Sequence, residues 1–411
     1  MTKSKLNILF ISPIIPIPAN DGGKLSLFGL LKGLASNGHK IDFFCYLQNK
    51  DYDKSIDTLS KYCKPFIILH STENKISKAI INFFNPLPYN LTKYLSSDLK
   101  KELKKYFEEN TPDVIHVATL SMAWVVDEIK KYSNAPIVLR QENFESMIFK
   151  RRFERERSFV LKHYLKYQYK KYIKYEPEIC GKFNKCIMIS NVDTKRLLEL
   201  NNRIRTVSIP VGVDEIANNY DSNVEPYSLV HIGSLNWYPN KDGIEWFINY
   251  VFTLVVAKYP EAKLYLYGGG INNDFKISGK LKNNIVIKGF VENIWQELAS
   301  KSIGIIPLRI GGGIRVKILE MMSFGIPLVT TEIGKEGIDA EPNKHLLVAN
   351  TPKEFTDSIE KIWLDESVGK YLTQNSKKKI NEKYTWSAVI KKFETTYFEQ
   401  LKSNQKNSRL N

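Results

Sequence analysis

The stretch SIGIIPLRIGGGIRVKILE (residues 302–320) joins a short apolar run to a glycine-rich turn and an amphipathic segment. An apolar run bounded by turn residues is typical of a buried strand, and apolar residues at helical spacing follow from Val316 onward. In open α/β sheets, ligands bind at loops that leave the carboxyl ends of strands and enter helices. The stretch therefore predicts a strand–loop–helix unit of a parallel sheet, with a ligand site in its loop.

The loop combines bare backbone with charges of both signs. Glycines let a ligand approach the backbone closely, and the start of the following helix favours an anion. Arginine and lysine suit a diphosphate there, whereas a glutamate one turn later suits paired hydroxyls such as those of a ribose. The residues concerned are Gly311, Gly312, Gly313, Ile314, Arg315, Lys317 and Glu320. An alternative interpretation makes the glycines ordinary turn residues and leaves the charged side chains solvated.

Strand-like runs alternate with helical patterns along both halves of the 411-residue chain. The runs are LNILFIS (6–12), KIDFFCYL (40–47), PDVIHVA (112–118), APIVLRQ (135–141), YSLVHIG (227–233), AKLYLYG (262–268), NNIVIKG (283–289), SIGIIPL (302–308), GIPLVTT (325–331) and HLLVA (345–349). This alternation indicates an α/β fold with parallel sheets, and the chain is long enough for two domains. The polar, aperiodic segment 209–228 resembles a linker, so we place the domains at 1–208 and 209–385. A helical pattern over about residues 386–405 either ends the second domain or crosses back to the first.

Composition indicates an ordinary globular protein. Hydrophobic residues make up 43% and charged residues 25% of the chain. The four cysteines show neither CxxC spacing nor the density of a disulfide scaffold, so we expect reduced thiols and a cytoplasmic location. Prolines interrupt the apolar N-terminal run, which indicates a first strand and not a signal peptide. No apolar stretch is long enough to span a membrane.

The net charge of +16 is concentrated in a basic, aromatic segment at 150–185. Such a segment is typical of a nucleic-acid patch, of a helix on anionic lipid, or of a solvated helix face. No nucleic-acid fold accompanies it, so we expect no nucleic-acid partner. The anionic membrane surface and the solvated face both remain open.

A second glycine loop follows the first predicted strand. Asp21, Gly22 and Gly23 open the first predicted helix, where glycines again permit close approach to a phosphate or an acceptor. Two such loops, one in each domain, would face each other across a cleft. That arrangement would hold a nucleotide and a second substrate between them.

Three longer segments share their pattern with a known enzyme family. They are ISPIIPIPANDGGKLSLFGLLKGLASNGHKI (11–41), IGSLNWYPNKDGIEWF (232–247) and GFVENIWQELASKSIGIIPLRIGGGIRVKILEMMSFGIPLVTTEIGKEGI (289–338). They resemble the GT-B glycosyltransferases of family 4, in particular the bacterial polysaccharide and exopolysaccharide branch. The resemblance covers most of the chain and is most specific over 289–338.

The resemblance implies two Rossmann-like domains whose parallel sheets face a central cleft, with a last helix that returns to the first domain. It further implies a nucleotide-sugar donor held mainly by the second domain and an acceptor on the first. The reaction would retain the anomeric configuration and require no metal or other cofactor. Asp51 and Asp53 resemble the D-x-D of metal-dependent transferases, but we interpret them as part of a lysine-rich loop.

Residue by residue, the resemblance assigns the donor ribose to Glu320 and the departing diphosphate to Arg315 and Lys317. Its other donor-binding positions are Gly311, Gly312, Gly313, Ile314, Gly233, Ser234, Asn240, Gly289, Phe290, Val291, Gly22 and Gly23. On the acceptor side it points to Arg140 and Asn143. Glu142 stands where many relatives carry a histidine, and we expect it to orient or deprotonate an acceptor hydroxyl.

Three positions depart from the family pattern. Gly312 replaces the first glutamate of E-x7-E, and Ser234 replaces an arginine that would contact phosphate. Glu142 replaces the histidine. We also include His116, at the end of a predicted strand, as a catalytic candidate, with a packed histidine as the alternative.

The sequence thus predicts a retaining glycosyltransferase that builds a bacterial surface glycan at the inner face of the cell membrane. Its partners would be a nucleotide sugar and a glycan or lipid-linked acceptor, with segment 150–185 on anionic lipid. One alternative is a degenerate GT-B subunit that binds a nucleotide or a partner transferase. Another is a GT-B sugar-nucleotide epimerase, for which no acid/base pair can be located.

Overall fold

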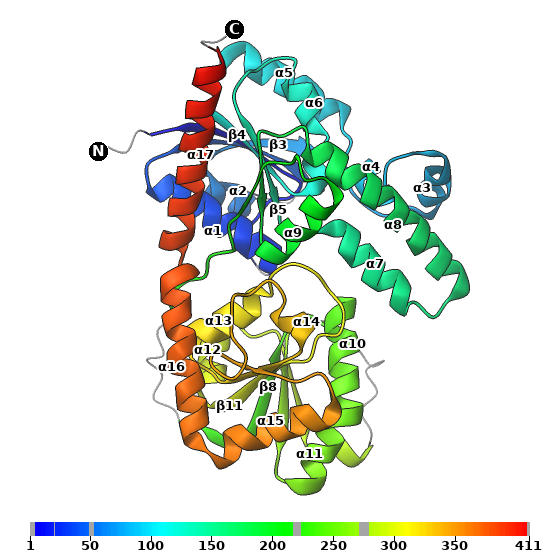
Figure 1. The fold of residues 1–411 in the computed structure, drawn as a ribbon, viewed down its shortest axis with the longest axis vertical. Helices are drawn as coiled ribbons and strands as arrows, with labels where there is room; N and C mark the ends of the chain where they lie inside the picture. Colours follow the sequence, from blue (N-terminus) through cyan, green and yellow to red (C-terminus); the bar gives the residue numbers. More distant parts are fainter. Residues whose placement is uncertain (1–4, 20, 49–52, 217–222, 271–278, 409–411) are drawn as a thin grey trace. The chain divides into compact units, whose positions relative to one another are not determined.

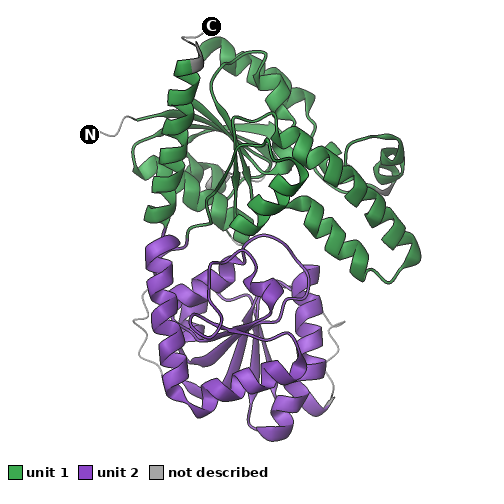
Figure 2. Ribbon diagram, in the orientation of Figure 1, with its two compact units in different colours: residues 1–212, 386–411 green, residues 213–385 purple. Residues whose placement is uncertain are grey.

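The computed structural model describes residues 5–19, 21–48, 53–216, 223–270 and 279–408. The chain forms two compact units, which Figure 2 colours separately. Unit 1 comprises Met1–Gly212 together with Trp386–Asn411, and unit 2 comprises Val213–Thr385. Residues 209–212 pack with unit 1, where Ile209 and Val211 are fully buried.

Unit 1 is built on a seven-stranded parallel sheet in the order β3-β2-β1-β4-β5-β6-β7. Its strands are β1 (Asn7–Ser12), β2 (Lys40–Leu47), β3 (Lys64–Leu69), β4 (Val114–Ala118), β5 (Ile137–Gln141), β6 (Lys185–Met188) and β7 (Thr206–Ser208). The strand order reverses between β1 and β4, which is where Rossmann-type sheets bind ligands. The sequence analysis missed β3, β6 and β7. The first is an edge strand with a proline, and the last has only three residues.

Helices cover this sheet and, in Figure 1, include a long pair that projects from it. They are α1 (Gly22–Ser36), α2 (Asp53–Ser60), α3 (Ile76–Ile81), η1 (Asn82–Phe84), α4 (Tyr89–Thr92), α5 (Ser97–Glu109), η2 (Leu120–Met122), α6 (Val125–Ile129), α7 (Glu145–Arg155), α8 (Phe159–Cys180), α9 (Asn191–Leu200) and α17 (Trp386–Ser408). The projecting pair is α7 and α8. The basic segment 150–185 therefore forms parts of two helices and the start of β6.

The last helix packs on unit 1, as the resemblance implied. α17 lies against α1, where glycines make room for it. A Cβ atom on Gly29 would lie 1.9 Å from the Trp386 ring, and one on Gly33 would lie 2.5 Å from Ile390. The start of α1 is fixed by Asp21, whose Oδ1 accepts a hydrogen bond from the Lys24 amide.

Unit 2 repeats this plan with a six-stranded parallel sheet in the order β10-β9-β8-β11-β12-β13. Its strands are β8 (Glu225–Ile232), β9 (Lys263–Tyr267), β10 (Ile285–Gly289), β11 (Lys301–Ile306), β12 (Leu328–Thr330) and β13 (Leu347–Val348). The order reverses between β8 and β11, so β11 and its following loop lie at the ligand-binding position of this sheet. The predicted α/β fold with two Rossmann-like sheets is confirmed.

The helices of unit 2 surround this sheet (Figure 1). They are α10 (Tyr238–Trp246), the π-helical η3 (Phe247–Phe252), α11 (Thr253–Lys258), η4 (Gly279–Leu281), α12 (Ile294–Ala299), α13 (Val316–Phe324), α14 (Glu332–Lys335), α15 (Pro352–Leu364) and α16 (Glu366–Lys383). α13 ends at Gly325, whose φ of 94° is a left-handed conformation that glycine adopts without strain. Over the described residues, no helix is long and apolar enough to cross a membrane.

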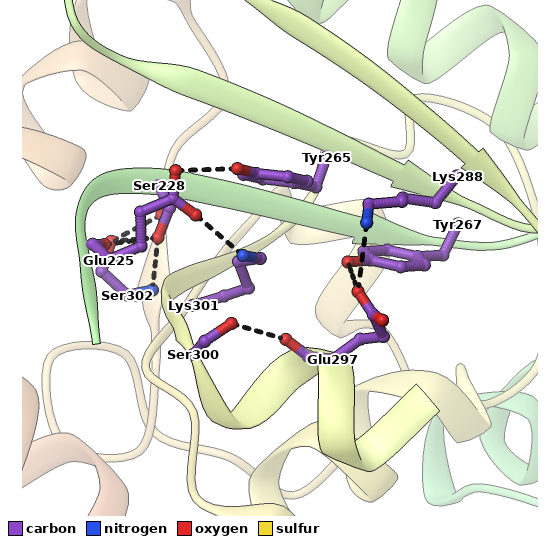
Figure 3. A network of polar contacts seen from close by, with 9 residues as sticks. All are labelled: Glu225, Ser228, Tyr265, Tyr267, Lys288, Glu297, Ser300, Lys301 and Ser302. Carbon is purple, nitrogen blue, oxygen red and sulfur yellow. Dashed lines mark hydrogen bonds and ion pairs between the residues drawn. The ribbon is translucent and has the colours of Figure 1, made fainter. Parts of the chain in front are cut away.

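A polar network holds β8, β9 and β11 together at the start of β8 and β11 (Figure 3). Lys301 Nζ and Tyr265 Oη donate to the Glu225 carboxylate at 2.8 and 2.7 Å. The same ammonium lies 3.9 Å from the centre of the Tyr265 ring. Partial burial acts to raise the pKa of Glu225, but the hydrogen bonds from Lys301 and Tyr265 outweigh it and leave the pKa below its usual value. Each charged group here has its partner within the fold.

Candidate functional site

The glycine loop between β11 and α13 is shaped around Arg315. Gly311 and Gly313 have φ values of 143° and 69°, which favour glycine. A Cβ atom on Gly311 would lie 2.1 Å from Arg315 Nη2. The Arg315 side chain is buried, and its Nη1 donates to the carbonyl oxygens of Gly312 and Gly313. Its guanidinium carbon lies 5.9 Å from the centre of the Trp237 ring. The loop therefore holds a cation beside the first turn of α13.

Lys317 reaches from α13 to the end of β8. Its Nζ donates to the Ile232 carbonyl at 2.9 Å and to Asn240 Oδ1 at 2.8 Å. Asn240 Nδ2 in turn donates to the Ser234 carbonyl at 2.8 Å. A Cβ atom on Gly233, whose φ is 153°, would lie 2.8 Å from Lys317 Nζ. The structure thus brings together four residues that the sequence analysis assigned to the donor: Gly233, Ser234, Asn240 and Lys317.

The two titratable groups of α13 have strongly shifted pKa values. Burial, and then the neighbouring charge of Arg315, lower the pKa of Lys317 to about 7. Burial, and then the Asp214 carboxylate, raise the pKa of Glu320 to about 7. Each group is thus held where its charged form is disfavoured, which is typical of functional sites. An anion beside Lys317 would favour the charged lysine.

The other predicted donor positions are placed but not brought into contact with this cluster. Ile314 is buried in the loop, and the half-buried Val291 follows Phe290, whose side chain is 76% exposed. Gly289 has a φ of 69° and no heavy atom within 4 Å of the position of a Cβ. Gly289 thus lies beside open space, and its neighbour Phe290 carries an exposed ring. The base-binding role of this segment stays a prediction.

The sequence analysis missed His231, which lies near Lys317, and Arg309, which follows β11. His231 on β8 is buried, its Nδ1 is 3.0 Å from the Ile305 carbonyl, and burial followed by the Lys317 charge holds its pKa well below the usual value. Arg309, in the loop after β11, donates to both carboxylate oxygens of Asp242 at 3.0 and 2.6 Å. Neither residue belongs to a recognisable short motif. Each is placed by a contact with a residue that is distant in sequence.

In unit 1, the predicted Glu142 lies beside the glycine-led helix α1. Its Oε1 accepts hydrogen bonds from Ser26 Oγ at 3.0 Å and from Arg140 Nε at 3.1 Å. Gly22 and Gly23 form the first turn of the same helix as Ser26. Glu142 and the glycine pair thus share the carboxyl edge of the sheet at β1 and β5, and the half-buried Glu142 keeps part of its surface exposed.

Arg140 and His116 lie in the core of unit 1, so we no longer assign them to substrate. Arg140 is 2% exposed and donates to Glu142, to the Ile209 carbonyl at 2.7 Å and to the Pro210 carbonyl. His116 is 0% exposed, and its Nδ1 is 2.7 Å from Tyr397 Oη on α17. Burial, and then the Arg140 charge, hold the pKa of His116 well below the usual value. Arg140 thus attaches residues 209–210 to β5, and His116 attaches α17 to β4.

The half-buried Asn143 has a carboxyl pair beside it that was not predicted. Glu176 on α8 is fully buried and accepts hydrogen bonds from Ser146 Oγ and from the amides of Glu145 and Ser146. Burial raises the pKa of Glu176 to about 8 and that of Glu145 to about 7, although hydrogen bonds from Ser146 and Asn143 act in the opposite direction. The sequence places the two glutamates 31 residues apart, so only the fold reveals the pair.

Thr119 is a further residue at the carboxyl edge of unit 1. Its φ of 70° is unusual for a branched side chain and follows directly after β4. Strained backbone at the end of a central strand is typical of ligand-binding edges. No feature of the sequence predicts this conformation.

The D-x-D pair lies at the margin of the described residues. Asp51 falls outside them, and the side chain of Asp53 is not described. Within the part of the chain that the structure describes, no group of three or more His, Cys, Asp or Glu side chains could hold a metal ion.

Comparison with known proteins supports the pattern of the second unit. Residues 226–365 match the family model of group 1 glycosyl transferases. A Klebsiella pneumoniae protein known as an uncharacterized 44.6 kDa protein in the cps region is 24% identical over 93% of this chain and 97% of its own length. The family match, this relative and the fold together support a GT-B glycosyltransferase.

Two solved structures show the same fold over nearly the whole chain. Sucrose-phosphate synthase from Thermosynechococcus elongatus has a TM-score of 0.70 at 15% identity and covers 97% of this glycosyltransferase and 100% of its own chain. S. aureus TarM, solved as a point mutant with fondaparinux, alpha-GlcNAc-glycerol and UDP, has a TM-score of 0.70 at 13% identity and covers 95% and 99%. These similarities confirm the GT-B architecture.

Proposed function

We propose that this glycosyltransferase moves a sugar from a nucleoside-diphosphate sugar to a hydroxyl of a glycan or lipid-linked acceptor, with retention and without a metal. The observation that carries the proposal is the Lys317 site, where a lysine with a lowered pKa reaches from the first turn of α13 to the end of β8. The relative from a cps region supports a role in polysaccharide synthesis. We place this role at the inner face of the cell membrane as part of the proposal.

The leaving diphosphate is the part of the reaction that unit 2 suits best. Charge develops on the departing phosphate and on an oxocarbenium-like sugar, so preorganised cations stabilise the transition state. Lys317, Arg315 and the first turn of α13 would supply this stabilisation. TarM was solved with UDP, which fits a diphosphate ligand of the same kind.

The remaining assignments concern the two hydroxyl-bearing groups. Glu320 lies one turn after Lys317 on α13 and would accept hydrogen bonds from the donor ribose in its ionised form. Glu142, held by Ser26 and Arg140, would orient the acceptor hydroxyl. With Gly312 in place of a glutamate, backbone amides of the glycine run would contact the transferred sugar.

A degenerate, nucleotide-binding subunit is the second candidate, because Gly312 lacks the carboxylate of the family motif. The geometry around the half-buried Lys317 fits a bound nucleotide for either candidate, so the two differ in turnover of the donor and not in binding. For the epimerase alternative, we assign no pair of residues as the acid and the base that the reaction would need.

A donor screen tests the proposal. The purified protein is incubated with UDP-, GDP-, dTDP- and ADP-sugars, and thermal unfolding and slow release of the nucleoside diphosphate are followed. We expect stabilisation by one nucleotide class with slow hydrolysis, and the loss of both in Arg315→Ala/Lys317→Ala. Stabilisation without any hydrolysis or transfer would favour the degenerate subunit, and no response to any donor would overturn the proposal.

A further inference from the structure

Exposed apolar side chains lie on two neighbouring segments of unit 1. On α3 and η1, Ile80, Ile81 and Phe84 are 62%, 68% and 95% exposed. In the first turn of α8, Phe159 and Val160 are 75% and 78% exposed. The two segments are neighbours, because side chains from both line one pocket. We call these five residues the apolar tip; gathered apolar residues on a surface mark an interaction site.

The tip is held outward by a firm attachment to α8. Lys171 Nζ donates to the Asn82 carbonyl at 2.6 Å and to Asn82 Oδ1 at 3.0 Å. The Phe83 ring stacks on Tyr167 with a centroid distance of 5.1 Å, and Tyr167 Oη donates to the Phe83 carbonyl at 2.7 Å. These contacts anchor η1 to α8 and leave its last residue, Phe84, exposed.

The segments that carry the tip, and those next to them in sequence, are basic. Residues 150–166 contain seven Lys and Arg against two Glu, and residues 75–84 contain two Lys and no acidic residue. Basic residues beside exposed aromatic and aliphatic ones are typical of surfaces that lie in the interface of an anionic bilayer. A second copy of the chain would bring the same positive charge to this face and be repelled.

A pocket of about 250 Å³ lies at the base of the tip. It is lined by Lys75, Ala79, Arg152, Leu161, Tyr164 and Gln168, among others. Arg152 is exposed and makes no ion pair with any residue that the structure describes. Two cations above an apolar and aromatic floor suit a phosphate-bearing head group whose chains lie on the tip.

We propose that α3, η1 and the first turn of α8 dock on an anionic bilayer, with the apolar tip in the interface and a lipid phosphate beside Arg152. This deepens the proposed function and rests on it, because docking would bring the enzyme to a lipid-linked acceptor. Within the segment 150–185, this proposal limits the predicted membrane contact to the first turn of α8 and to Arg152. The second half of α8 belongs to the core, where Tyr172, Glu176 and Ile179 are buried.

Vesicle co-sedimentation tests the docking surface. The full chain is mixed with vesicles of phosphatidylcholine alone or of phosphatidylcholine with phosphatidylglycerol. We expect binding to the anionic vesicles only, and a loss of at least about tenfold in Phe84→Ser/Phe159→Ser because two large side chains no longer enter the interface. Arg152→Gln should weaken binding severalfold. Tyr250→Ser/Leu254→Ser is the matched control, because these residues are 60% and 49% exposed on unit 2.

A labelled cysteine reports the contact directly. All four native cysteines are buried, so an environment-sensitive dye would react selectively at F84C or at the control Y250C. We expect a blue shift with anionic vesicles at position 84 only. Equal shifts at both positions, equal binding to neutral vesicles, or unchanged binding of the Phe84→Ser/Phe159→Ser variant would overturn the docking surface. Self-association that disappears in this variant, without vesicle binding, would overturn it in favour of a protein interface.

The same samples separate this inference from the proposed function. Thermal stabilisation by nucleotide sugars is measured on each variant without vesicles, and the tip variants should match the wild type. Vesicle binding absent in the wild type with donor binding kept would overturn the docking surface alone. Donor binding absent with vesicle binding kept would overturn the proposed function alone.

Discussion

Unit 2 contains two lysine clusters that differ in how their charges are satisfied. Lys301 is paired with the Glu225 carboxylate and lies over an aromatic ring, and the pKa of that carboxyl is below its usual value. Lys317 donates to a carbonyl oxygen and to an amide oxygen, and burial and then Arg315 lower its pKa to about 7. We infer that the Lys301 cluster stabilises the fold and that the Lys317 cluster binds an anion.

The difference arises from position in the sheet. Lys301 begins β11, whereas Lys317 reaches the carboxyl ends of the strands, where the order of the sheet reverses. At Lys301, the pairing with the Glu225 carboxylate favours the stability of the fold. At Lys317, affinity for a charged ligand is higher when the lysine has no carboxylate partner in the fold, because the ligand then supplies the negative charge.

The largest effect on donor affinity is expected from Lys317→Met. The substitution removes the charge that faces the diphosphate, and we expect a loss of about 100-fold in nucleotide affinity, within the range for a buried charge pair. Titration calorimetry with the nucleotide found in the donor screen measures this loss. An unchanged dissociation constant in a folded variant would move the diphosphate elsewhere.

The pH dependence of nucleotide affinity should reflect the titration of Lys317. Bound diphosphate favours protonated Lys317, so its pKa in the complex lies above the free value of about 7 and binding takes up a proton. Between about pH 7.5 and about pH 9, affinity should fall by up to about tenfold per unit as free Lys317 loses its proton. Glu320 is largely ionised in this window, because its pKa is also about 7. A flat profile in the wild type would exclude Lys317 as the titrating ligand.

Glu320→Gln should have a smaller effect. The amide keeps the size of the side chain but weakens its hydrogen bonds to ribose hydroxyls, so we expect a loss of about fivefold to tenfold in affinity. A comparison of the ribose and 2′-deoxyribose forms of the same nucleotide measures the contribution. If the wild type and the variant show the same ratio between the two nucleotides, Glu320 does not contact that hydroxyl.

Lys301→Met should leave donor affinity unchanged and lower stability instead. Glu225 would lose its ammonium partner, at a cost of about 1 kcal/mol in the free energy of unfolding because the carboxylate is partly exposed. Thermal unfolding and nucleotide titration are followed on the same sample. A large change in affinity would mean that the two clusters are not independent.

The sequence predicted the parts of the fold that local patterns determine. The glycine loop, the strands on either side of the strand-order reversals and the long C-terminal helix each have a periodic or turn signal within about ten residues. The strands β3, β6 and β7 were missed, because their short runs are stabilised by neighbours and not by their own pattern.

Local pattern alone grouped only those residues of the candidate site that lie close in sequence, whereas Gly233, Ser234 and Asn240 were assigned through the family resemblance. Arg315, Lys317 and Glu320 share one loop and helix, whereas the contact of Lys317 with Asn240 spans 77 residues. His116 and Arg140 were misassigned for a related reason. Their strands end at the ligand edge, but α17 and residues 209–210 cover them, and no local pattern shows that covering.

Proton uptake on nucleotide binding tests the central claim most directly. The nucleoside diphosphate is titrated into wild type and Lys317→Met at about pH 8 in buffers that differ in ionisation enthalpy. The Lys317 site predicts uptake approaching one proton per nucleotide in the wild type and none in the variant. Binding without proton uptake in the wild type, or the same uptake in both proteins, would contradict it.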